Sequence, residues 1–72
     1  MDYTEKNIQI KGEFITLGQF LKLADVIFSG GEAKVFLKRE EVYVNDAIEE
    51  RRGRKLYKGD KVQVQDKLFV IC

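Results

Sequence analysis

Two helix-start signatures in the first half of the chain constrain its fold more than any other feature of the sequence. In each, a Thr or Ser that can cap a helix is followed three residues later by Gln or Glu, at Thr16–Gln19 and at Ser29–Glu32. This is the spacing of a capping box, in which each side chain accepts a hydrogen bond from the backbone N–H of the other residue. We therefore predict one helix that begins at Thr16 and a second that begins at Ser29.

Apolar residues follow each signature at helical spacing, which predicts one buried face per helix. The residues expected in the core are Leu17, Phe20, Leu21 and Ala24 in the first helix, and Ala33, Phe36 and Leu37 in the second. On the opposite face of the second helix, Gly30, Lys34 and Lys38 are spaced four apart, so two lysines lie above the amides of the helix start. This face suits an anion, although a capped and solvated helix would show the same residues.

The second half of the chain has the pattern of short strands joined by turns. The expected strands are Val42–Val44, Val62–Val64 and Leu68–Ile71, with turns at Asn45–Asp46 and Lys58–Asp60 and an earlier strand at Asn7–Ile10. This order predicts an α+β fold with two helices packed on a small, mainly antiparallel sheet. We expect residues 1–72 to form a single domain, because 72 residues bury too little surface for a second core.

Positive charge is concentrated in one segment. The whole chain has a net charge of +1, but residues 51–61 carry six basic side chains against one acidic, a net charge of +5. We expect most of residues 49–58 to form a loop. Guanidinium groups bind phosphate through paired hydrogen bonds and also stack on bases. The candidate anion ligands are therefore Arg51, Arg52, Arg54, Lys55 and Lys58. The alternative is a solvated loop whose charge Glu49 and Glu50 offset.

The chain has no histidine and a single cysteine, Cys72, which removes the usual zinc ligand sets and nucleophile–base pairs. We therefore expect neither an enzyme nor a metal or other cofactor. The longest apolar run, Leu68–Cys72, has five residues, whereas a membrane-spanning helix needs about 20. The first residues show no apolar stretch typical of a signal peptide. A lone cysteine suits a reducing compartment, so the expected location is the cytoplasm.

Several motifs follow one another in a recognisable order. They are Ile15-Thr16-Leu17, Phe20-Leu21, Ser29 with Ala33 and Leu37, Val42-Tyr43-Val44-Asn45, and Lys58-Gly59-Asp60-Lys61-Val62. Over residues 14–64 this pattern resembles the S4 domain, an RNA-binding module. The stretch Ser29–Lys34 is similar to the free-standing bacterial branch of small YaaA/YbcJ-like proteins. This chain departs from the family in having Thr16-Leu17-Gly18 where many members have Arg-Leu-Asp, and Asp46 where glycine is frequent.

The resemblance implies that the two helices and the following hairpin form an L-shaped surface, the αL motif, that grips structured RNA. The implied RNA is ribosomal or transfer RNA, with the ribosome or one of its subunits as the setting. The positions that match this surface are Ser29, Gly30, Gly31, Lys34 and Lys38 on the second helix and Asn45 on the hairpin turn. Together with the basic segment, we expect them to form a single cationic cradle. Tyr43 and Tyr57 are candidates for stacking on an unpaired base, or else partial cover for the core.

Two alternatives remain open from the residues alone. Glu40, Glu41, Glu49 and Glu50 lie beside the basic run and would repel a polyanion locally, which favours a ribosome-associated protein-interaction adaptor. Phosphate contacts also do not distinguish RNA from DNA, so only the resemblance favours RNA.

Overall fold

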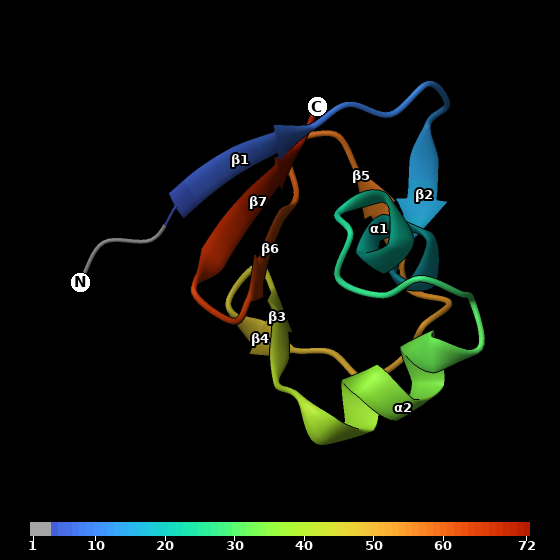
Figure 1. The fold of residues 1–72 in the computed structure, drawn as a ribbon. Helices are drawn as coiled ribbons and strands as arrows, with labels where there is room; N and C mark the ends of the chain where they lie inside the picture. Colours follow the sequence, from blue (N-terminus) through green and yellow to red (C-terminus); the bar gives the residue numbers. More distant parts are fainter. Residues whose placement is uncertain (1–3) are drawn as a thin grey trace.

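Two short helices and seven short strands follow one another in the computed structural model, which describes residues 4–72 (Figure 1). The elements are β1 (Thr4–Ile8), β2 (Phe14–Thr16), α1 (Leu17–Leu23), α2 (Glu32–Arg39), β3 (Val42–Val44), β4 (Ala47–Ile48), β5 (Lys55–Tyr57), β6 (Lys61–Val64) and β7 (Lys67–Ile71). Neither helix has the length and apolar character needed to span a bilayer in this part of the chain.

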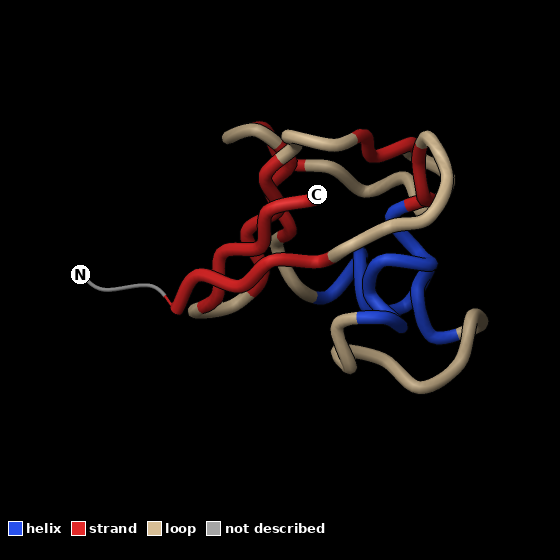
Figure 2. The backbone as a smooth tube through the Cα atoms, turned by 90° about the horizontal axis from the view of Figure 1, so that it is seen from above, coloured by secondary structure: helices blue, strands red, loops and turns tan. Residues whose placement is uncertain are grey.

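The strands form two separate sheets. The larger has the order β1-β7-β6-β3-β4 and is antiparallel except for the parallel pair β1–β7. The smaller is an antiparallel ribbon of β2 and β5. Figure 2 shows both helices gathered beside the strands at one end of the molecule. The predicted fold class, two helices on a small and mainly antiparallel sheet, is confirmed.

The buried face of each helix is the one that the apolar spacing predicted. Leu17, Phe20 and Leu21 of α1 are fully buried. Ala33, Phe36 and Leu37 of α2 are buried beside them, together with alternate residues of β3, β6 and β7. Phe20 meets Phe69 of β7 edge to face, with 5.1 Å between ring centroids. This packing joins α1 to the larger sheet.

Most of residues 49–58 lie outside helices and strands, as expected, but the segment also contains strand β5, which sequence reasoning did not predict. Lys55–Tyr57 pairs with β2, and the register sets Leu56 opposite Ile15. Leu56 is completely buried, so this strand contributes one apolar residue of the charged run to the core. The first strand is also longer and earlier than expected, Thr4–Ile8 in place of Asn7–Ile10.

The two predicted caps have different outcomes. At α1 the capping box is confirmed, because the Thr16 hydroxyl accepts from the Gln19 amide at 3.2 Å and the Gln19 side chain accepts from the Thr16 amide at 2.9 Å. At α2 the predicted start at Ser29 is wrong, since the helix begins at Glu32 with no side-chain cap. The Glu32 carboxylate instead accepts from the amides of the preceding turn, at Phe28 and Ser29.

This difference predicts unequal costs for the two matched substitutions Thr16→Ala and Ser29→Ala. Thr16→Ala should lower the free energy of unfolding by about 1 kcal/mol, because it removes a true helix cap. Ser29→Ala should cost clearly less, since the Ser29 hydroxyl makes only a 3.3 Å contact with Glu32. Urea denaturation of both variants measures the two losses, and equal losses would show that Ser29 caps α2 after all.

Candidate nucleic-acid interface

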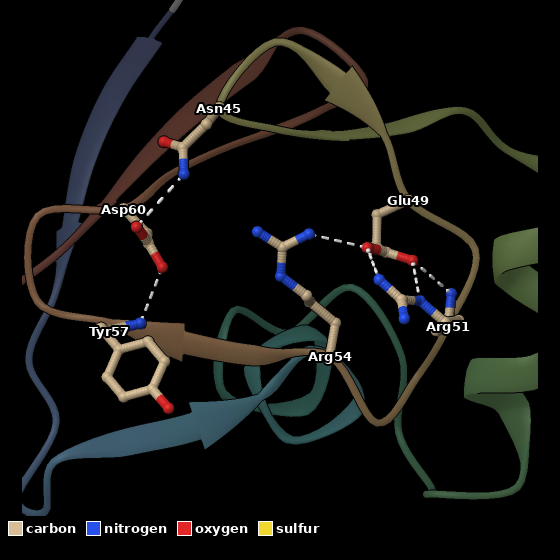
Figure 3. A network of polar contacts seen from close by, with 6 residues as sticks. All are labelled: Asn45, Glu49, Arg51, Arg54, Tyr57 and Asp60. Carbon is tan, nitrogen blue, oxygen red and sulfur yellow. Dashed lines mark hydrogen bonds and ion pairs between the residues drawn. The ribbon is translucent and has the colours of Figure 1, made fainter.

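A buried carboxylate organises the segment of residues 49–54, called here the basic loop. The side chain of Glu49 is only 8% exposed and accepts from the Arg51 side chain at 2.9 and 3.1 Å, from the Arg51 amide at 3.0 Å and from the Arg54 side chain at 2.8 Å (Figure 3). The bonds from Arg51 lower the pKa of Glu49 to about 2, against the opposing effect of burial. Glu49 in turn raises the pKa of Arg51.

The basic loop is docked on the first turn of α1. The first amides of a helix lack partners within the helix. Here the Leu17 amide donates to the Arg54 carbonyl at 2.8 Å, and the Gly18 amide donates to the Arg52 carbonyl at 2.9 Å. The loop therefore completes the start of α1, which fixes the position of its backbone relative to the helices.

The basic loop and α2 both lie close to Gly18. A Cβ atom placed on Gly18 would lie 3.6 Å from the Cβ atoms of both Ala33 and Arg52, so these two atoms are at most twice that distance apart. Ala33 lies in the first turn of α2, and Figure 1 shows the chain between β4 and β5 passing close to that helix. The loop and the start of α2 are therefore neighbours, although they are far apart in sequence.

The turn before α2 leaves two amides available. Glu32 takes the Phe28 and Ser29 amides, and the Glu32 and Ala33 amides donate to the carbonyls of Ser29 and Gly30. Within residues 4–72, neither the Gly30 amide nor the Gly31 amide makes a hydrogen bond. Both glycines are exposed at the positive end of α2.

Exposed cations flank these amides. Lys34, Lys38 and Arg52 are exposed, and none has an ion-pair partner in the part of the chain that the structure describes. Lys34 directly follows Ala33, which lies close to Gly18, as Arg52 does. The amides of Gly30 and Gly31, the two lysines of α2 and Arg52 are grouped here under the name α2 face.

The structure does not gather the whole basic segment into a single cradle. Arg51 and Arg54 are paired with Glu49, although the Arg51 side chain remains 76% exposed and that of Arg54 34%. A guanidinium has five N–H donors, so Arg51 keeps donors that can reach a ligand. Figure 3 shows the side chains of Arg54, just before β5, and of Tyr57 pointing in opposite directions. Lys55 lies two residues before Tyr57 in β5 and shares its side, so it belongs to another surface, and Lys58 follows in the next turn.

Asn45 has an internal role in this structure. Its side-chain oxygen accepts from the Lys61 amide at 3.0 Å, and its side-chain nitrogen donates to Asp60 at 3.1 Å (Figure 3). Asn45 and Asp46 have φ angles of 51° and 72°, which confirms the prediction of a turn with left-handed backbone. These bonds tie the β3–β4 turn to the turn before β6, and Asn45 is exposed there, so its RNA contact stays a prediction.

The two tyrosines differ in their surroundings. Tyr43 is half-buried in the larger sheet and donates to Glu41 at 3.0 Å. Tyr57 is 48% exposed on the β2–β5 ribbon, and its ring makes a tilted contact with the ring of Phe14. Of the two stacking candidates, Tyr57 therefore offers the more accessible ring.

Sequence reasoning overlooked two exposed aromatic residues. Phe28 is 85% exposed in the turn before Ser29, and Phe14 is 38% exposed on β2. Phe28 falls outside the helical apolar spacing, which is the one signal that separates it from core residues. Phe14 carried no such signal, because its exposure depends on the pairing of β2 with β5.

Comparison with known proteins places the chain among S4 domains. The family model described as "S4 domain" matches residues 8–72, a range that includes α2 and the basic loop. The chain is also 66% identical over 58 residues to a Bacillus subtilis (strain 168) protein named "Probable ribosome maturation protein RlbA". That alignment covers 81% of this chain and 82% of the relative.

The lowered pKa of Glu49 predicts a specific dependence of stability on pH. Its contribution is fully present above about pH 4.5, the ordinary pKa, and is lost as the pH falls towards about 2, the pKa in the folded protein. At neutral pH, Glu49→Gln should lower the free energy of unfolding by about 2 kcal/mol, the typical worth of hydrogen bonds to charged groups. The difference from the parent protein should shrink as the pH falls through this window.

The exposed neighbour Glu50 supplies the control. Glu50→Gln also removes one negative charge, but Glu50 makes no bond to Arg51 or Arg54. Denaturant unfolding at a series of pH values measures all three proteins. Equal pH profiles for the parent and Glu49→Gln would show that the network does not stabilise the fold.

Proposed function

Because the chain belongs to the S4 domain family of RNA-binding modules, we propose that it grips the phosphate backbone of structured RNA with the α2 face. The single observation that carries this proposal is the pair of open amides at Gly30 and Gly31 beside unpaired cations. The proposal includes no catalytic step and no cofactor. The chain acts by binding alone.

The start of α2 offers a phosphate both donors and a favourable field. Two adjacent N–H groups are open there, and the helix dipole places partial positive charge at the same end. Glu32 makes no hydrogen bond to these amides, and its Oε1 accepts from the amides of Phe28 and Ser29. A phosphate oxygen would therefore meet free donors on Gly30 and Gly31.

The exposed cations extend the grip along the RNA backbone. Lys34 and Lys38 are like charges at i and i+4, which costs about 0.2–0.5 kcal/mol in an isolated helix, and a polyanion would relieve that repulsion. Arg52 and the outer donors of Arg51 supply further contacts. A-form RNA presents phosphates and 2′-hydroxyls on its surface and hides its base edges, which suits a small rigid face of this kind.

Ribosomal RNA is the proposed target, and the cytoplasm the proposed location. The supporting observation is the name of the relative, a probable ribosome maturation protein. The ribosome or one of its subunits is accordingly the proposed partner, and residues 1–72 are proposed to act as one domain. Transfer RNA remains the second candidate among structured RNAs, because phosphate contacts carry no sequence information.

The adaptor hypothesis loses part of its basis in this structure. It rested on four glutamates beside the basic run. One of them, Glu49, is buried and already paired with Arg51 and Arg54, so it does not face a partner. Glu40, Glu41 and Glu50 remain available to a protein partner. RNA binding that is independent of salt would favour the adaptor, because phosphate contacts release counterions.

Salt dependence tests the proposed mechanism quantitatively. If about five phosphates are engaged, a plot of log affinity against log salt concentration should have a slope of about −3.5 to −4.5. The measurement is a binding titration of a ribosomal RNA hairpin at several salt concentrations. A flat plot would contradict the phosphate grip.

Substitutions on the α2 face should weaken the same binding. We expect the double variant Lys34→Ala, Lys38→Ala and the single variant Arg52→Ala to lower affinity for every structured RNA. Each phosphate that the variant no longer neutralises should reduce the steepness of the salt plot by about one. The matched control is Lys6→Ala, an exposed lysine on β1 at the far edge of the larger sheet. If Lys6→Ala weakens binding as much as Arg52→Ala, charge acts without a defined site.

A further inference from the structure

The outward face of the β2–β5 ribbon carries an aromatic pair that the core does not use. The register sets Phe14 opposite Tyr57 and Ile15 opposite Leu56. Leu56 is fully buried, so the alternation of side chains along a strand sends Phe14 and Tyr57 outward. The two rings lie 5.8 Å apart at an interplanar angle of 50° and remain 38% and 48% exposed.

Lysines surround this pair. The Lys55 ammonium lies 4.8 Å from the centre of the Phe14 ring, a cation–π contact. Lys11 and Lys58 line a shallow groove together with Tyr57, and Lys22 lines the adjoining groove along Phe14.

Opposite charge is sparse on this face. Glu13 is the one carboxylate lining these two grooves in the described part of the chain. None of the lysines around the rings is in an ion pair within residues 4–72. The rings are therefore set among cations that an anionic ligand would neutralise.

We propose that this face, called here the β2–β5 platform, binds an unpaired segment of RNA. A base stacks on the exposed ring of Tyr57 beside Phe14, and the neighbouring phosphates contact Lys58 and Lys11. Stacking suits any base because every base has a π face, and the lysines suit the backbone on either side. The inference rests on the proposed function only for the identity of the polymer, since none of these residues belongs to the α2 face.

The platform follows the basic loop along the chain. Arg54 ends the basic loop, and Tyr57 follows three residues later in extended chain, roughly 10 Å along β5. Figure 3 shows that the Arg54 side chain, just before β5, and the Tyr57 side chain point in opposite directions. A flexible single strand that leaves a bound helix can bend round this edge.

The test compares two RNA ligands that differ only in a single-stranded tail. One is a blunt RNA hairpin, and the other is the same hairpin with a short unpaired tail that contains 2-aminopurine. The proteins are the parent and the variants Tyr57→Phe, Tyr57→Leu and Phe14→Leu. The matched control is Ile48→Leu, a change at an exposed apolar residue of β4 in the other sheet.

We expect the tail to raise the affinity of the parent protein about ten-fold, near the low end for one stacked base, and to quench the 2-aminopurine fluorescence. Tyr57→Phe keeps the ring and should keep the gain, as should Ile48→Leu. Tyr57→Leu and Phe14→Leu should lose the gain and the quenching while binding the blunt hairpin as the parent does. A thermal unfolding curve for each variant confirms that it is folded.

Two results would overturn the inference. One is a parent protein that gains nothing from the tail, which would leave the platform to a protein partner. The other is a Tyr57→Leu variant that keeps both the gain and the quenching, which would show that the ring is not the contact. Loss of blunt-hairpin binding alone, with the tail still bound through Tyr57, would contradict the α2 face and leave the platform standing.

Discussion

The bonds between Glu49 and two arginines hold together the part of the molecule on which its proposed activity depends. One buried carboxylate accepts from Arg51 and Arg54, and the segment between them supplies the carbonyls that complete the first turn of α1. A loop with this much positive charge would otherwise spread in solution, because its cations repel one another. Glu49 neutralises part of that charge on the inner side of the loop and leaves Arg52 exposed beside α2. Glu49 therefore both stabilises the loop and determines which of its cations stay exposed.

The same arrangement separates structural cations from available ones. Arg54 is mostly covered and acts within the fold, Arg51 shares its donors between Glu49 and solvent, and Arg52 has no ion-pair partner in the part of the chain that is described. The hydrogen bond from Asn45 to Asp60 links two further turns of the domain. Small RNA-binding domains need such preorganisation, since a flexible cationic loop pays an ordering entropy when it binds.

Much of the fold could be predicted from the sequence, because local signals and tertiary packing agree there. The capping box at Thr16, the buried stripes of both helices and the left-handed turn at Asn45 each depend on neighbouring residues and are all present. The start of α2 could not be placed from the sequence. The Glu32 carboxylate accepts from the Phe28 and Ser29 amides of the preceding turn, and the helix begins only at Glu32. The division of the basic segment was also beyond local reasoning. It depends on which strand buries Leu56 and on the burial of Glu49, and both are set by distant parts of the chain.

A titration of the ¹⁵N-labelled protein with an A-form RNA hairpin, followed by NMR, tests the central claim most directly. The Gly30 and Gly31 amides are the proposed phosphate donors, and Gly53 reports on the basic loop that Glu49 holds beside them. We expect these three amide signals to shift together over the same range of RNA concentrations. Unchanged signals for all three, with shifts confined to the outer face of the larger sheet around Tyr43 and Gln63, would contradict an RNA grip by the α2 face.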